Sequence, residues 1–293
     1  MHRAARAAQL DVSLMKRLLL LSMLFVVPPS LGAVEISVGT TQLSIPSPAG
    51  YSPITSDMQP YAEVAKRFVP PSNEQFALFL PEADAAAARR GEIPQPKRWF
   101  YVQTTKALIE RFVSTSEFAE LKRSVKTQNE DILKKAESQM PGLLEKLNKG
   151  ISADYNVDLN LSLDQMLPLP THYETERGLA YSTLLKYKIN DEQGKPSILE
   201  GVVTTTFVHI QGKVLFLYVN AEKSGLEWSR SESRKWADTV IAANPSTGDV
   251  AARESQSSGS GFDWNKVITK AIVGAVIGGL VGGLTYVFRK KRS

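Results

Sequence analysis

The chain has 293 residues, of which 43% are hydrophobic and 22% charged, and its formal net charge is +5. This composition is typical of a folded protein with one or two domains, and it excludes a fully disordered chain. Because the chain has no cysteine, it has no disulfide, thiol nucleophile, iron–sulfur cluster or zinc–thiolate site.

Much of the positive charge flanks the two most apolar segments of the chain. Basic residues in such positions set membrane topology, and no interior basic run is paired with an RNA-binding aromatic signature. We therefore predict no nucleic-acid partner. The flanking residues are Arg3, Arg6, Lys16 and Arg17 before the first segment and Arg289, Lys290, Lys291 and Arg292 after the last.

Residues 1–33 have the parts of a secretory signal peptide. A basic start at Met15–Arg17 precedes the apolar run Leu18–Val27, two prolines and small residues up to Ala33. We predict cleavage after Ala33 or Gly32, and Met15 is an alternative start. The alternative to cleavage is a retained anchor, but ten apolar residues span only about 15 Å as a helix, half of a bilayer core.

Residues 34–244 are predicted to form an extracytoplasmic α/β domain. Alternating apolar residues over Val34–Val38 and Gln42–Ile45 predict an opening hairpin. An apolar stripe predicts a helix over Asp57–Val69, which two prolines end. Two further strands are predicted over Gln75–Leu80 and Arg98–Thr104.

Ser114 and Glu117 have the spacing of a capping box, which predicts the start of a long amphipathic helix. We expect this helix to run to about Gln139, to break near Pro141–Gly142 and to continue in a second piece through Leu147. Its charged face is interpreted as solvent-exposed.

The second half of the domain is rich in strands. Strands are predicted over Leu179–Ile189, Ile198–Ile210 and Lys213–Ala221, with Gln211–Gly212 as a hairpin turn. The last strand is apolar on both faces, so helices should cover both sides of the sheet. A closing helix is predicted over Leu226–Ala243. The predicted fold class is therefore α+β, a mainly antiparallel sheet covered by helices in an α/β/α sandwich.

The entry segment Leu43–Tyr51 and the closing helix that carries Trp236 support a comparison with a known family. Over about Gln42–Asn244 the order of elements resembles that of PsbP-like α/β/α sandwich proteins. The resemblance implies a binding or assembly role, since such domains are mostly associated with these roles.

His172, Glu174 and Glu176 are the candidate metal ligands. They are spaced by two, so in an extended strand their side chains share one face and can bind a divalent metal. An exposed loop is the alternative interpretation.

Other candidate sites are weaker. The run Asp154–Asp164 begins like an EF-hand loop, but Leu159 stands where that loop needs glycine. We interpret this run as an amphipathic strand, and His209 as a hydrogen-bonded histidine of an apolar strand. No GxSxG, HExxH, phosphate-loop or dinucleotide motif is present. We predict no cofactor, and an enzyme whose catalytic residues meet only in the fold stays an open alternative.

Asn244–Gly248 resembles the NPxTG form of a cell-wall sorting signal. About twenty residues, several of them charged, separate it from the apolar segment, whereas sorting signals run almost directly into theirs. We therefore interpret it as the end of a helix, followed by a flexible linker rich in serine and glycine over residues 245–266.

Val267–Phe288 is predicted to be a transmembrane helix. Its 22 residues span about 33 Å, which is enough to cross a bilayer. Because the basic tail 289–293 follows the span, we expect the domain outside and the C-terminus in the cytoplasm. The prediction is a single-pass protein of the cytoplasmic (inner) membrane.

Glycines recur in this segment at intervals of four, a spacing that allows helices to approach closely in membranes. They predict self-association or packing on a partner helix. These glycines are Gly274, Gly278, Gly279, Gly282 and Gly283.

The function predicted from these features is that of a membrane-anchored binding or assembly protein of a bacterial-type envelope, with an unknown envelope protein as its partner. One alternative is an envelope metal-dependent enzyme using His172, Glu174 and Glu176. A second is an oligomer assembled through the glycine-rich helix.

Overall fold

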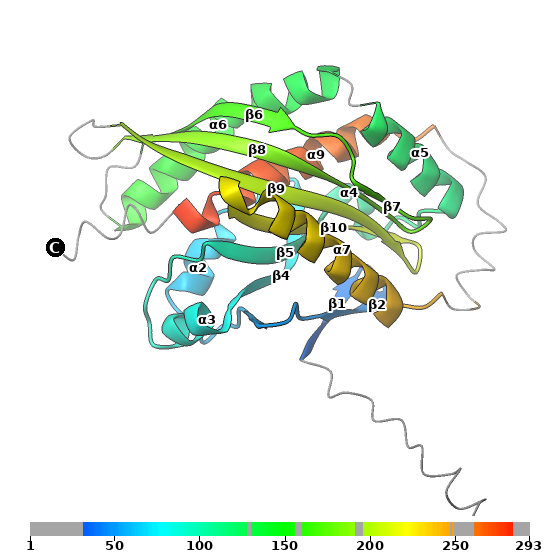
Figure 1. Cartoon of the computed structure of the whole chain (residues 1–293), viewed down its shortest axis with the longest axis horizontal. Helices are drawn as coiled ribbons and strands as arrows, with labels where there is room; N and C mark the ends of the chain where they lie inside the picture. Colours follow the sequence, from blue (N-terminus) through cyan, green and yellow to red (C-terminus); the bar gives the residue numbers. More distant parts are fainter. Residues whose placement is uncertain are drawn as a thin grey trace, which may run out of the picture. The chain divides into compact units, whose positions relative to one another are not determined.

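The computed structural model describes residues 32–127, 130–155, 160–190, 196–246, 248 and 261–283. Within these ranges an antiparallel sheet carries helices on both faces (Figure 1). The predicted signal peptide up to Leu31 and the predicted basic tail 289–293 lie outside the described residues.

The strands form one hairpin and one large sheet. Their bounds are β1 (Ala33–Val38), β2 (Thr41–Pro46), β3 (Tyr51–Pro53), β4 (Asn73–Pro81), β5 (Arg98–Thr105), β6 (Asn160–Pro168), β7 (Tyr173–Glu174), β8 (Gly178–Asn190), β9 (Pro196–Ile210) and β10 (Lys213–Glu222). β1 and β2 pair with each other. The large sheet has the order β3-β4-β5-β10-β9-β8-β6, and β7 also pairs with β8. All of these pairings are antiparallel.

The helices divide between the two faces of the sheet. Their bounds are α2 (Tyr61–Lys66), α3 (Glu82–Arg89), α4 (Lys106–Ile109), α5 (Thr115–Lys126), α6 (Glu130–Tyr155), α7 (Leu226–Ala243), α9 (Trp264–Gly278) and the short 3-10 helices η1 (Lys223–Gly225) and η2 (Val281–Gly283). α7 lies against one face together with the β1–β2 hairpin. α5, α6 and α9 lie against the other face (Figure 1).

Local sequence signals place several of these elements as predicted. Gln211 and Gly212 both have positive φ (48° and 74°), as a two-residue hairpin turn requires, and they join β9 to β10. Ser114 and Glu117 form the predicted capping box at the start of α5, where each side chain bonds the other residue's backbone N–H.

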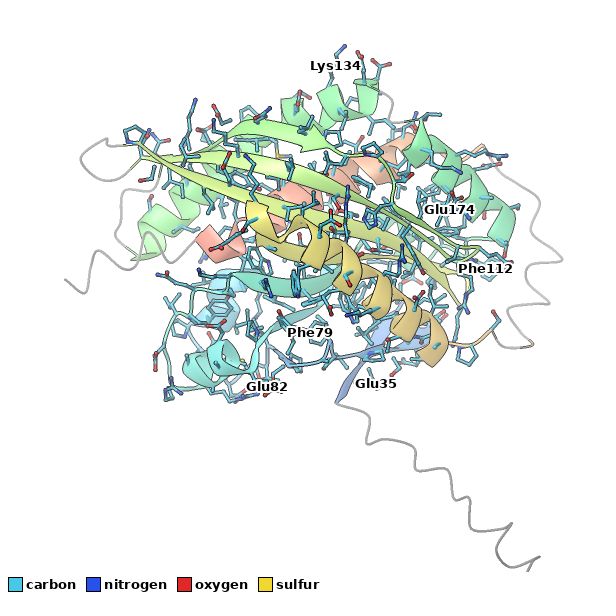
Figure 2. The ribbon with its side chains drawn as sticks, viewed as in Figure 1. Glu35, Phe79, Glu82, Phe112, Lys134 and Glu174 are labelled. Carbon is cyan, nitrogen blue, oxygen red and sulfur yellow. The ribbon has the colours of Figure 1, made fainter. Side chains whose placement is uncertain are left out.

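The α7 face of the sheet is an aromatic core. Phe79 of β4, labelled in Figure 2, meets Trp236 of α7 with ring centroids 5.7 Å apart, and Phe100 meets the same indole at 5.2 Å. At the end of α7, the Asn244 side chain accepts from the Ser44 amide N–H at 2.9 Å and donates to the Ser44 carbonyl at 2.7 Å. Asn244 thereby ties α7 to β2, which gives the first residue of the NPxTG-like motif a structural role.

The opposite face is built around α9. Every residue of this helix except Asn265, Lys266 and Lys270 is buried. Polar side chains of the sheet donate hydrogen bonds to its backbone carbonyls, which have a second lone pair available beyond the helical bond. These bonds are Asn73 Nδ2 to Lys270 O (3.2 Å), Tyr218 Oη to Ala271 O (2.9 Å), Tyr101 Oη to Gly274 O (3.1 Å), Tyr187 Oη to Val276 O (2.7 Å) and Trp99 Nε1 to Gly278 O (3.3 Å).

The glycines of this segment make that approach possible. A Cβ at Gly274 would lie 2.8 Å from Tyr218 Oη, a Cβ at Gly278 would overlap the Tyr101 ring, and a Cβ at Gly282 would lie 2.6 Å from Trp99. At Gly279 it would lie 3.1 Å from Tyr187 Oη. Four of the five predicted packing glycines therefore face the protein's own sheet, and the fifth, Gly283, lies in η2.

The predicted transmembrane helix over Val267–Phe288 is wrong. α9 has 15 residues, about 22 Å of helix, and ends at Gly278. None of the helices within the described ranges combines the length and apolar character needed to cross a membrane. An apolar run without charges is also what a helix buried on all sides requires, and residues 271–278 of α9 meet that requirement between the sheet, α5 and α6.

Smaller differences have local causes. Instead of breaking at Pro141, the long helix is interrupted after α5, and α6 continues through Pro141 because Met140, Leu144 and Leu147 are buried in the core. Since α6 extends to Tyr155, the strand predicted from Asp154 begins only at Asn160. The predicted helix over 57–69 is shorter and spans only α2.

Replacing glycine by alanine should have opposite effects at Gly278 of α9 and at Gly142 of α6. Gly278→Ala should lower the free energy of unfolding by about 1–3 kcal/mol, because the added methyl group displaces Tyr101. Gly142→Ala, on the exposed side of α6 with no atom near its Cβ, should raise it by about 0.5–1 kcal/mol. Urea unfolding of both variants measures the difference. A Gly278→Ala protein with unchanged stability but altered oligomer size in light scattering would instead favour packing between chains.

Candidate functional site

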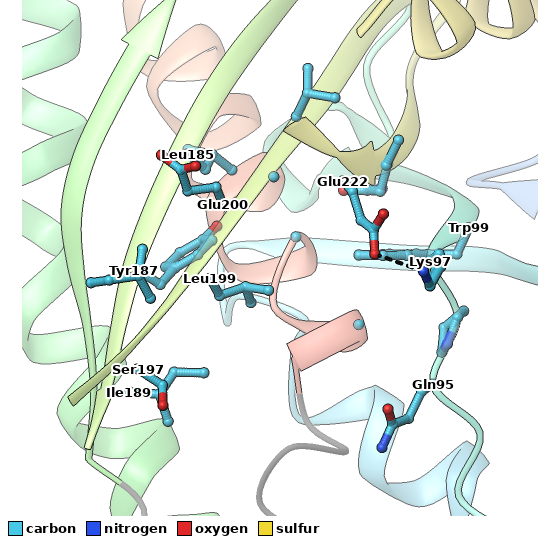
Figure 3. A pocket seen from close by; sticks show the side chains of 18 residues that line it. Gln95, Lys97, Trp99, Leu185, Tyr187, Ile189, Ser197, Leu199, Glu200 and Glu222 are labelled. Carbon is cyan, nitrogen blue, oxygen red and sulfur yellow. Dashed lines mark ion pairs between the residues drawn. The ribbon is translucent and has the colours of Figure 1, made fainter. Parts of the chain in front are cut away.

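A cavity of about 260 Å³ opens on the α9 face, beyond the point where α9 ends. Its walls are the ends of β8 and β10, the start of β9, the start of β5 with the preceding segment 95–97, and Gly279 and Gly282 after α9 (Figure 3). These two glycines approach the sheet closely, since a Cβ at Gly279 would lie 3.1 Å from Tyr187 Oη and one at Gly282 would lie 2.6 Å from Trp99.

Asn220 of β10 occupies the inner wall of this cavity. The β9–β10 turn sets its register, so that Asn220 lies opposite Val203 on one side and Trp99 on the other. Side chains alternate along a strand, and Asn220 therefore points to the same face as Phe216 and Tyr218, toward α9.

The Asn220 carboxamide is buried, with an exposed fraction of 1%. Burial raises the pKa of neighbouring Tyr101, and a hydrogen bond from the Asn220 side chain opposes that rise. The Tyr101 hydroxyl donates in turn to Gly274 O at 3.1 Å. Asn220 therefore takes part in the polar contacts between the sheet and α9.

The remaining inner wall is apolar. Trp99, Tyr187 and Leu185 are almost fully buried, and their polar atoms, where present, are bonded to α9 carbonyls. Toward solvent the wall ends in Ile198, whose exposed fraction of 51% is high for an isoleucine. The wall thus presents an apolar surface that is open at one end. It also includes Ile189, Leu199 and Val202.

The charges of the wall are neutralised in pairs. Lys97 Nζ lies 3.4 Å from Glu222 Oε1 (Figure 3), and Glu200 accepts from Lys223 Nζ at 2.9 Å. Both pairs are exposed at the rim. The cavity therefore carries no excess charge from these side chains.

The predicted metal ligands are separated in function and surroundings. Glu174 pairs with Lys126 Nζ at 3.0 Å and with Lys122 Nζ at 3.6 Å, beside α5 (Figure 2). Glu176 is exposed. Over the described ranges, no three His, Asp or Glu side chains are arranged to hold a metal ion. The structure therefore does not bring His172, Glu174 and Glu176 together as a site.

The two described histidines have different roles. His209 is buried, its Nε2 lies 2.7 Å from Val113 O, and its ring stacks on Phe118, as expected of a structural histidine. Burial, together with the charges of Arg230 and Arg234, lowers the pKa of His172 to about 4. His172 is therefore neutral at pH 7.

The cavity residues are not predicted from the sequence. The prediction treats the strand Lys213–Ala221 as apolar on both faces, although Asn220 is a polar residue on the face of Phe216 and Tyr218. A polar residue inside a strand buried on both sides is the local signal that was available. Its neighbours Trp99 and Tyr187 come from distant strands and have no such signal.

The low pKa of His172 predicts acid sensitivity. Between its ordinary pKa of 6.5 and about 4 in the fold, the unfolded chain binds a proton that the folded protein does not. Stability should therefore fall as the pH drops through this window, and His172→Asn should flatten that fall between pH 6.5 and 5. Urea midpoints at several pH values measure the slope.

Glu174→Gln is the matched control. The pairing with Lys126 lowers the Glu174 pKa from its ordinary 4.5, so its contribution to stability is lost only at lower pH. This variant should keep the wild-type slope between pH 6.5 and 5. An unchanged slope in His172→Asn would mean that another group titrates there.

Comparisons with known proteins assign no family. No protein-family model and no curated protein matches the chain. Among solved structures, the chain is similar to the Ran-binding protein Mog1p of Saccharomyces cerevisiae, with 10% sequence identity, coverage of 73% of this chain and 91% of that one, and a TM-score of 0.23. A similarity at this TM-score supports no inference about fold or function, and the resemblance to PsbP-like proteins stays a prediction.

Proposed function

We propose that this protein is a binding protein that acts outside the cytoplasmic membrane and holds its ligand in the cavity at the end of α9. The observation that carries the proposal is an open cavity of about 260 Å³ whose inner wall is formed mainly by buried apolar side chains. Apolar pockets with a few polar groups that converge on the ligand are the usual form of a binding site.

The titratable groups of the wall favour binding over chemistry. Glu200 and Glu222 are ion-paired at the rim. The Tyr187 phenol donates to Val276 O at 2.7 Å, and burial raises its pKa well above the ordinary value. General acid–base catalysis needs a group that titrates near the working pH, and the raised pKa takes the Tyr187 phenol away from that range.

The volume of the cavity limits the ligand. An apolar cavity of about 150 Å³ holds a benzene molecule, so about 260 Å³ accommodates one ring with a short substituent. The ligand is therefore a small molecule, or the side chain of a partner protein that enters through the open end.

The extracytoplasmic part of the proposal rests on the signal peptide predicted over residues 1–33. The absence of cysteine is compatible with export, since a domain of this size can be stable on its hydrophobic core.

Gly201→Leu should block the cavity. Gly201 lies on the same face of β9 as Leu199 and Val203, which pack on the α9 side of the sheet. A Cβ at Gly201 would meet only Ala221 O, at 3.4 Å. A leucine there fills the cavity without displacing the backbone. Ligand-observed NMR with acetophenone, a neutral ring with a short polar substituent, should show binding to the wild-type protein and at least a tenfold weaker affinity for the variant.

The control adds the same side chain elsewhere. Gly142→Leu, at an exposed position of α6 with no atom within 4 Å of its Cβ, should bind acetophenone like the wild type. If the wild-type protein binds none of the small aromatic probes, or if Gly201→Leu binds them equally well, the cavity is not a ligand site.

A further inference from the structure

A groove between α6 and β6 lies apart from the cavity at the end of α9. Its volume is about 690 Å³, and one face of α6 lines it together with β6. β6 is the last strand in the order of the large sheet, so no described strand covers its outer edge. An uncovered edge presents main-chain donors and acceptors that can pair with another extended segment.

Asn148 of α6 shows what this edge recognises. Its Oδ1 accepts from the Leu161 N–H at 3.2 Å, and its Nδ2 donates to the Leu161 carbonyl at 3.0 Å. These are the two bonds that a residue of a neighbouring antiparallel strand would make. Leu163 follows two residues later in the same register, so its N–H and C=O point to the same outer edge.

The floor of the groove is apolar. Met140 and Leu144 of α6 are buried there, as are Leu161 and Met166 of β6, and half-buried Leu163 packs against the same cluster. Side chains alternate between the two faces of a strand, so every second residue of an added segment would face this floor. The segment therefore needs apolar residues in alternation with residues that face solvent.

Two features limit the length of the segment. Asn148 closes the edge at Leu161, and a β-bulge between Leu163 and Gln165 interrupts it further along. Such interruptions protect an edge from long strands, including β6 of a second copy. From Asn148 back to Glu137 the α6 axis rises about 16 Å, which matches about five extended residues. The groove therefore suits a short segment of another protein.

The end of the groove opposite Asn148 is acidic. Along the groove, Glu145 is paired with Lys149 at 2.6 Å, and Asp164 with Lys186 at 3.2 Å. Glu137 is exposed and forms no ion pair within the described ranges. A basic residue of the bound segment would complement it.

We infer that this groove binds a short extended segment of a partner protein, which adds to β6 as an antiparallel strand. The segment begins with a basic residue and then alternates apolar and polar residues. The basic residue comes first because β6 starts beside Asn148 and runs back along α6 toward Glu137, so an antiparallel segment enters at Glu137. The groove shares no wall residue with the cavity, and the inference goes beyond the proposed function.

N-methylated peptides test the strand pairing. The probes are acetyl-Lys-Val-Ser-Val-Ser-Val-amide and its counterparts with leucine or phenylalanine in place of valine, titrated against the full chain by fluorescence anisotropy. N-methylation of the apolar residues should weaken binding about tenfold or more, since it removes the donors that face β6. N-methylation of the serines, whose N–H groups face away from β6, should leave the affinity within about twofold.

Variants of α6 test the location. Glu145→Trp adds a large side chain in the groove and should weaken binding about tenfold or more. Lys146→Trp is the matched control, because Lys146 is exposed and does not line the groove. Glu137→Lys should reverse the charge preference, so that a peptide beginning with glutamate binds more tightly than one beginning with lysine.

The contrary outcomes are distinct. If no peptide binds, or if both N-methylated forms bind like the parent, β6 adds no strand and the inference is overturned. Loss of binding on serine methylation alone would overturn the antiparallel direction. If light scattering shows a dimer that the peptide dissociates, a second copy occupies the edge and the partner protein is overturned. Acetophenone binding in the cavity is independent of all these results.

Discussion

The rest of this face depends on one contact. The glycine stripe of α9 lies directly against the polar side chains of the sheet. Tyr101, Tyr218 and Asn73 reach the helix backbone only because glycines stand opposite them. α5 and α6 then pack on the outer side of α9. Without α9, the sheet would expose apolar and aromatic side chains, together with phenol groups that have lost their acceptors. The apolar side chains are unfavourable in water, and the unpaired phenols are unfavourable in an apolar interior.

The cavity depends on the same contact. Gly279 and Gly282 form part of its wall, so the site is complete only when α9 is docked on the sheet. A ligand that binds the docked arrangement alone must stabilise that arrangement, and docking must raise the affinity by the same factor. The helix that completes the core is thus also part of the ligand site, which joins stability and binding in one element.

Local patterns predicted much of the fold. The capping box at Ser114, the turn at Gln211–Gly212 and the closing helix over Leu226–Ala243 all depend on residues close in sequence. The location of the apolar run after Val267 cannot be predicted in this way. A helix in a bilayer and a helix buried between a sheet and two other helices require the same lack of charge. Asn220 could be noticed as a polar residue in a buried strand, but the cavity beside it also depends on Trp99 and Tyr187, which lie far away in the chain.

Every hydrogen bond described above between a sheet side chain and α9 ends on a main-chain carbonyl, and this determines what the helix must conserve. An acceptor is present at every position whatever the side chain, so the sheet recognises a path of small residues and not a particular sequence. Descendants of this chain can exchange the outward-facing residues of α9 freely if α5 and α6 change with them. Distant relatives would then share the interval of four between glycines, opposite tyrosines on the sheet, and little else that an alignment detects.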